Sequence, residues 1–233
     1  MNKKKSSGFT VGGIENFYDQ NVQQGLELFS AYIEQCEISS NVAIDDFYKY
    51  KSSDVFDSES EHPYLKTSFR DIDGHTFDPE YIYRDVFPQM VRHSILLMLM
   101  SFIENELLIL CKNLARNKLT NTNFSRRNYP KTKSLLTHIK CYLVEEAHFS
   151  FDDELNIVWN DVFALQAVRN NIIHNSGKYK RSKQPVDAFI NNNPHISIEN
   201  QEILMDSIFL REVISLFKDL FMNLQANIRT QKN

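Results

Sequence analysis

The sequence predicts an all-α protein, a single helical bundle of five to six helices. Apolar residues recur every three to four positions over several long stretches, as they do on the buried face of a helix. Glycine is scarce, with 6 residues in a chain of 233, which disfavours a turn-rich sheet protein. Hydrophobic residues make up 42% of the chain and charged residues 24%, a composition typical of a globular protein with a core.

The first part of the chain is predicted to be an extension of the bundle. Residues 1–13 are basic and end in two glycines, so we expect a disordered arm. Within residues 14–87, apolar spacing predicts a helix over 14–36 and a shorter one over 42–50. Residues 51–80 are rich in Ser, Asp, Glu and Pro, and we interpret them as a long loop.

Residues 88–228 are predicted to form the core of the bundle, packed with the extension as one domain. The strongest helical pattern runs from Pro88 to Asn117, and its wide apolar face marks the central helix. A polar, basic loop is expected over 118–129. The next helix is expected from Pro130, a residue suited to the first helical turn, to about Ala147.

Two more helices complete the predicted bundle. Asp152 precedes a helix that runs to His174 and stops at Asn175-Ser176-Gly177. Residues 178–195 are predicted to be a polar loop, and a small β-hairpin is expected around Asn200. Asp206 then begins a last helix that ends near Ile228.

Charge is unevenly distributed along this chain of formal net charge −4. Residues 107–144 contain eight basic and no acidic residues, and residues 162–186 contain five basic and no acidic residues. Such segments indicate either an anionic partner such as RNA or a solvated face. The basic residues that we select as candidates for RNA binding are Lys178, Lys180, Arg181, Arg126 and Arg127.

Cysteine usage and hydropathy predict a cytoplasmic location. Cys36, Cys111 and Cys141 are odd in number and far apart, so no disulfide framework or zinc ribbon is indicated. The N-terminal residues lack the apolar core of a signal peptide. The most apolar stretch, 95–103, is followed by acidic residues, and we expect a buried helix with no membrane partner.

The motif that carries chemistry is Arg169-Asn170-Asn171-Ile172-Ile173-His174. Arginine offers a fork of donors for phosphate oxygens, and histidine can transfer a proton near neutral pH. In a regular helix the two residues lie about 140° apart around the axis. They converge only if the last turn loosens, or if a phosphate or a partner lies between them.

These residues could cleave RNA by attack of its own 2′-hydroxyl group. In this hypothesis His174 transfers the proton, Arg169 binds the phosphate and stabilises the transition state, and Asn170 and Asn171 hold the reacting groups. Glu104 is a candidate for orienting Arg169, with the alternative that it is only a polar residue near the rim of a core helix. No metal or other cofactor is expected, because residues 162–186 contain no carboxylate. One histidine per chain is few for a pair of acid and base catalysts. Two chains that place their motifs together would supply two histidines.

The motif resembles the R-x4–6-H signature of the HEPN superfamily, and the helix around Ser101–Leu107 resembles an acidic helix in several of its branches. The resemblance covers residues 88–228. It implies a helical bundle, a homodimer with both motifs in one cleft, and metal-independent endoribonuclease activity in toxin–antitoxin or anti-phage systems. It also implies Arg169 and His174 as the catalytic pair, Asn170 as the motif's polar residue, and an antitoxin, nucleotidyltransferase or ATPase as a partner.

Two alternatives remain open at this point. The chain could be a non-catalytic HEPN-like module that binds RNA, a nucleotide or a protein partner. It could also be a helical assembly protein in which Arg169 and His174 only complement the dipole at the end of a helix.

Overall fold

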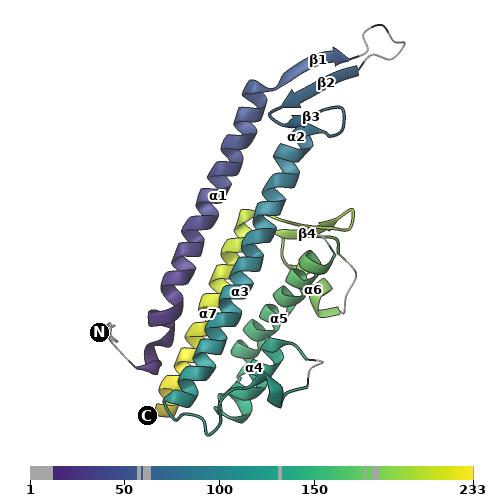
Figure 1. Ribbon diagram of the computed structural model, residues 1–233. Helices are drawn as coiled ribbons and strands as arrows, with labels where there is room; N and C mark the ends of the chain where they lie inside the picture. Colours follow the sequence, from purple (N-terminus) through teal and green to yellow (C-terminus); the bar gives the residue numbers. More distant parts are fainter. Residues whose placement is uncertain are drawn as a thin grey trace, which may run out of the picture. The chain divides into compact units, whose positions relative to one another are not determined.

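The computed structural model describes residues 13–56, 59, 64–130, 133–175, 177–179 and 184–232. Within these residues, six helices of nine or more residues carry most of the chain, which confirms the mainly helical class (Figure 1). The predicted N-terminal arm lies outside the described residues, except for Gly13.

The chain forms two compact units, each assembled from separate segments. The first unit comprises residues 1–27, 100–163 and 215–233, and the second comprises residues 28–99 and 164–214. Four long helices contribute to both units. The predicted packing of extension and core into one domain stays a prediction.

Helix α1 (Gln23–Tyr50) is one continuous helix, whereas the sequence predicted two. A 3-10 turn at Ile14–Asn16 and a π-helical turn at Tyr18–Val22 precede it. The predicted break fell on a polar stretch, but the Ser39 hydroxyl donates to the Gln35 carbonyl at 2.8 Å, so serine is accommodated inside the helix. Buried Ile33 and Phe47 lie on one side of it.

A three-stranded antiparallel sheet occupies part of the predicted 51–80 loop, so that prediction is wrong there. Strands β1 (Ser52–Phe56), β2 (Tyr64–Phe69) and β3 (Ile72–Asp73) pair in chain order, with Ser52 opposite Ser68 and Phe69 opposite Ile72. Residues 52–55 of β1 are exposed and β2 is mostly half-buried, and neither strand has alternating apolar residues, which hid them in the sequence. Phe69 packs with Phe47 and Tyr83 in a small aromatic cluster.

The central helix matches its prediction closely. Helix α2 (Pro79–Tyr81) and a π-helical turn at Ile82–Val86 lead into α3 (Phe87–Arg116). In the second unit, α1 and α3 run side by side (Figure 1), and Arg92 of α3 binds Glu37 of α1 through two hydrogen bonds of 2.8 and 2.7 Å.

Helix α3 belongs to the helical segment Pro79–Arg116, which is long and apolar enough to cross a membrane. The apolar stretch 95–103 is therefore only part of a longer apolar helical segment. Half of its most apolar stretch is buried within the protein, and the core helix of a soluble protein has the same character. Burial, rather than length, is the observation that favours a core helix.

The first unit has its own apolar core. The N-terminal segment packs on the C-terminal helix α7 (Ser207–Lys232): the Phe17 and Phe221 rings lie 6.1 Å apart, and the Tyr18 amide donates to Gln225 at 2.8 Å. The single tryptophan, Trp159, is fully buried, with the rings of Phe151 and Phe163 at 5.4 and 6.3 Å.

Helix α4 (Leu135–Glu145) begins five residues later than predicted. Ser134 caps it by accepting from the Thr137 amide at 3.2 Å, whereas Pro130 lies in the preceding loop. A 3-10 turn at Arg126–Asn128 interrupts that loop.

The remaining elements confirm the motif helix and the hairpin. Helix α5 (Asp153–His174) ends at the predicted histidine, and strands β4 (Ile196–Glu199) and β5 (Glu202–Met205) form the expected hairpin. Helix α6 (Gln184–Asn192) replaces half of the predicted 178–195 loop. Its apolar anchors, Val186 and Ile190, are only two buried residues one turn apart, too few to stand out in a polar stretch.

Candidate functional site

The motif helix α5 stays regular through its last turn. The Asn175 amide donates to the Asn171 carbonyl at 3.0 Å, and the Gly177 amide then donates to the Ile172 carbonyl at 3.1 Å. Gly177 has φ +80°, a left-handed conformation that glycine adopts without penalty just after the helix ends. The last turn does not loosen before His174, so that route to convergence of Arg169 and His174 is absent.

Backbone hydrogen bonds to the β4–β5 hairpin hold the end of α5 in place. The Ile203 amide donates to the Gly177 carbonyl at 3.1 Å, and the Tyr179 amide donates to the Gln201 carbonyl at 2.6 Å. Lys178 forms an antiparallel bridge with Glu202, and its side chain is exposed. The chain that follows the motif is therefore fixed to the β4–β5 hairpin.

Arg169 is half-buried and is oriented by its neighbour in sequence. Its Nη1 donates to Asn170 Oδ1 at 3.0 Å. Its Nε is buried and has no hydrogen-bond partner among the residues that the structure describes. A buried donor without a partner is unfavourable, so the guanidinium group is prepared to bind an acceptor such as a phosphate oxygen.

His174 is exposed, in contrast to Arg169. In a regular helix it lies about 140° from Arg169 around the axis, so one chain presents the two groups on different faces. Asn171, between them, is buried and has a structural role: its Nδ2 donates to the Ala167 carbonyl at 3.1 Å and its Oδ1 accepts from Asn175.

The other predicted site residues are dispersed along the chain. Glu104 is half-buried on α3 in the first unit. Arg126 and Arg127 are exposed on the 3-10 turn, also in the first unit. Lys180 and Arg181 lie outside the described residues. Within the second unit, the structure therefore brings together Arg169, Asn170, Asn171 and His174 on one helix, with Lys178 just beyond its end.

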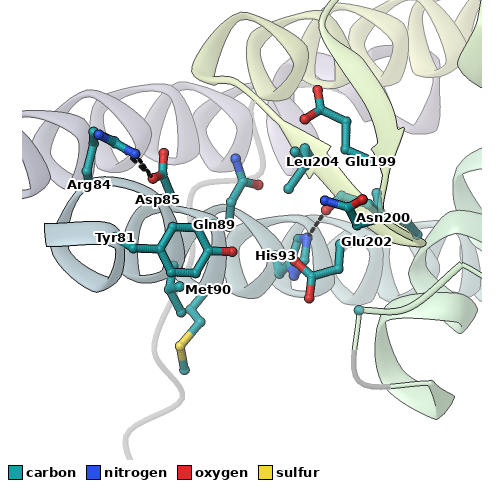
Figure 2. Close-up of a pocket in the computed structure, with 13 residues that line it drawn as sticks. Tyr81, Arg84, Asp85, Gln89, Met90, His93, Glu199, Asn200, Glu202 and Leu204 are labelled. Atoms are coloured by element: carbon teal, nitrogen blue, oxygen red, sulfur yellow. Dashed lines mark hydrogen bonds and ion pairs between the residues drawn. The ribbon is translucent and has the colours of Figure 1, made fainter. Parts of the chain in front are cut away.

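A pocket of about 510 Å³ adjoins the end of the motif helix in the second unit. Gly177 lines it together with residues of α2, α3 and the β4–β5 hairpin. Figure 2 shows Tyr81, His93 and Glu202 around this space, with Arg84 paired to Asp85 at 2.9 Å. Because Arg84 is neutralised by this pairing and Glu199 and Glu202 also line the pocket, its lining does not favour a phosphate.

His93 is the one histidine in the lining of this pocket. Its Nε2 donates to the Ile203 carbonyl at 2.8 Å, and burial lowers its pKa. A neutral ring fits this role, since the residue links α3 to β5 and lies against Gly177. Spacing in the sequence gave no signal for this contact, because His93 and Ile203 are far apart along the chain.

No cluster of three or more His, Cys, Asp or Glu side chains suited to a metal ion occurs among the described residues. The motif itself offers a guanidinium group, on Arg169, and an imidazole ring, on His174. No family model matches the chain, and no curated protein or solved structure is similar enough to count as a match.

Proposed function

We propose that the protein is a metal-independent endoribonuclease of the HEPN type that acts as a cytoplasmic homodimer in toxin–antitoxin or anti-phage defence. The observation that carries the proposal is the state of the motif: His174 is exposed, while Arg169 is held by Asn170 and keeps a buried Nε without a partner among the described residues. Proton transfer requires a histidine that the substrate can reach, and phosphate binding requires an oriented guanidinium group with a donor left to pair.

In the proposed reaction the 2′-oxygen of RNA attacks the adjacent phosphorus atom as the bond to the 5′-oxygen breaks. The proton of the 2′-hydroxyl passes to a histidine, and a protonated histidine supplies a proton to the leaving 5′-oxygen. Arg169 neutralises the charge that develops on the phosphoryl oxygens. The products end in a 2′,3′-cyclic phosphate and a 5′-hydroxyl.

The regular helix makes a second copy of the chain part of the proposal. Since Arg169 and His174 lie on different faces of α5, the phosphate would bind between Arg169 of one chain and His174 of the other. In this arrangement each phosphate meets one His174, which takes the 2′ proton as a base and then, protonated, supplies a proton to the leaving 5′-oxygen.

The test is cleavage of single-stranded RNA by the purified protein in excess EDTA, with product ends identified by mass spectrometry. We expect 2′,3′-cyclic phosphate ends, and we expect His174→Ala and Arg169→Ala each to slow cleavage by about 100-fold or more. His75→Ala and Arg211→Ala, which replace exposed residues of the same types in the same unit, should retain the wild-type rate.

Other outcomes would redirect the assignment. Cleavage that survives His174→Ala, or that stops in EDTA, would reject the mechanism. Salt-dependent RNA binding without cleavage, weakened by Arg169→Ala, would identify the non-catalytic binding module instead.

A further inference from the structure

A second pocket lies in the first unit and does not involve the Arg169/His174 motif. Its volume is about 460 Å³, and the described residues that line it are Arg126, Arg127, Tyr129 and His138. This volume falls within the range of about 300–1,000 Å³ that is usual for small-molecule sites. The 3-10 turn supplies the two arginines, and α4 supplies the histidine.

The two arginines give the pocket a positive side. Both side chains are exposed, and neither forms an ion pair with any residue that the structure describes. Adjacent guanidinium groups can bind the oxygens of one anion through several charge-assisted hydrogen bonds. This arrangement favours an anion with more than one oxygen, such as a phosphate group.

His138 supplies an independent indication of a ligand. Its ring is 1% exposed, and its Nε2 lies 2.9 Å from the Pro130 carbonyl, which can only accept, so Nε2 carries the proton. Its Nδ1 is buried and has no partner among the described residues. A buried polar atom is rarely left in that state, and a ligand that donates a hydrogen bond would satisfy it.

Tyr129 gives the pocket an uncharged aromatic wall. Its ring stacks on His138, with centroids 5.1 Å apart and planes 17° apart. Burial, together with the nearby carboxylate of Glu145, raises the pKa of Tyr129 to about 12, so the phenol stays neutral at physiological pH. Glu146 accepts a hydrogen bond from Thr122 at 2.7 Å, and neither glutamate lines the pocket.

We propose that this pocket binds a small organic phosphate monoester. Arg126 and Arg127 hold the phosphate, and the organic part lies against Tyr129 and donates a hydrogen bond to Nδ1 of His138. Binding of such a ligand is a function beyond RNA cleavage. Its test does not depend on Arg169 or His174.

Calorimetric titration of the full chain with three probes tests the proposal. Adenosine monophosphate, which carries an amino donor, should bind more tightly than phenyl phosphate, and phenyl phosphate more tightly than inorganic phosphate. Arg126→Ala and Arg127→Ala should each weaken binding of adenosine monophosphate about tenfold or more. Arg116→Ala removes an exposed arginine of the same unit that does not line the pocket, and it should bind like the wild type.

Several results would overturn the site. These are the absence of saturable binding, equal affinity for inorganic phosphate and the organic probes, or an equal loss in Arg116→Ala. A second measurement, nitrogen-15 NMR of the histidine rings, should show a change at Nδ1 of His138 when adenosine monophosphate binds. The His138 signal is assigned from its absence in His138→Asn, and an unchanged Nδ1 signal at saturation would also contradict the proposal.

Competition with RNA identifies the source of the ligand. Displacement of adenosine monophosphate by a 5′-phosphorylated oligonucleotide, but not by its dephosphorylated form, would identify an RNA end as the occupant. No displacement by either would support a free small molecule. Equal displacement by both would show that the site binds phosphodiesters, and the proposal would fail.

Discussion

Asp206 combines two roles at the start of α7. Its Oδ1 accepts from the amides of Ile208 and Phe209 at 2.9 Å, and its Oδ2 accepts from His195 Nδ1 at 2.9 Å. Burial alone would raise the pKa of Asp206, but the hydrogen bonds from Phe209, His195 and Ile208 together lower it. The carboxylate form is therefore favoured by folding.

This shift sets the pH dependence of one contribution to stability. Because the folded-state pKa is lowered, the contribution is complete above the unfolded-state pKa of about 3.9 and is lost as the pH falls through the folded-state value. We expect Asp206→Ala to reduce the free energy of unfolding by about 1 kcal/mol at pH 7, as for other N-cap residues. Urea denaturation at pH 7 and pH 2 should show the difference from wild type shrinking at low pH.

Asp45→Ala provides the control, since Asp45 is an exposed aspartate of the same unit. A deficit in Asp206→Ala that is as large at pH 2 as at pH 7 would mean that the charge of Asp206 contributes nothing to the cap.

Single residues of the site were partly predictable. The sequence located Arg169 and His174 at the end of a helix, because Asn175 to Gly177 carries a recognisable stop signal. It could not predict that Asn171 is bonded within its own helix, since asparagine is equally suited to a ligand contact. Nor could it predict His138, whose Nε2 meets the Pro130 carbonyl and whose Nδ1 has no partner among the residues that the structure describes.

Among the elements, the β4–β5 hairpin has a strained turn. Asn200 and Gln201 both have positive φ, 50° and 68°, as in the tight turns that prefer Asn-Gly. Glutamine has a Cβ that disfavours this conformation, so Gln201 is not the most stable residue at the second position. The Gln201 carbonyl nevertheless accepts from Tyr179 and so connects the turn to the chain after the motif.

We therefore predict that Gln201→Gly stabilises the protein. The expected gain is about 0.5–1 kcal/mol in the free energy of unfolding, because glycine adopts positive φ without the penalty. The backbone bond to Tyr179 is kept. Thermal unfolding should show a raised midpoint, and Glu199→Gly, a substitution in the strand, should instead lower it. A lower midpoint for Gln201→Gly would mean that its side chain stabilises the turn.

Elements with strong apolar periodicity were predicted well, and polar elements were not. Helices α3, α5 and α7 have long buried faces, and the spacing of apolar residues in the sequence already marks those faces. Strands β1 to β3 and helix α6 bury few apolar residues and are set by backbone pairing or by one or two anchors. The start of α4 was misplaced because a serine cap competes with a proline signal, and the serine is the residue that bonds the Thr137 amide.

For the whole molecule, the question raised by the motif is whether one chain or two make the site. If the phosphate binds between Arg169 of one chain and His174 of another, two inactive variants can complement each other. A mixed dimer of Arg169→Ala and His174→Ala keeps one site in which both groups are intact. After random exchange of subunits, activity should recover to roughly a quarter of the wild-type level.

Cleavage by the mixture, compared with each variant alone, is the measurement. Recovery requires that subunits exchange, which a tagged and an untagged copy of the wild type can verify by co-purification. If exchange occurs and activity stays absent, the two residues act within one chain, and the composite site is excluded.

The position of Trp159 makes the two units separately visible in solution. It is the only indole in the chain and is enclosed by Phe151 and Phe163, so tryptophan emission, excited selectively over that of tyrosine, reports on the first unit alone. Circular dichroism, in contrast, samples the helices of both halves. Coincident melting curves from the two signals would identify a single cooperative body, whereas separated curves would identify the half that loses its order first.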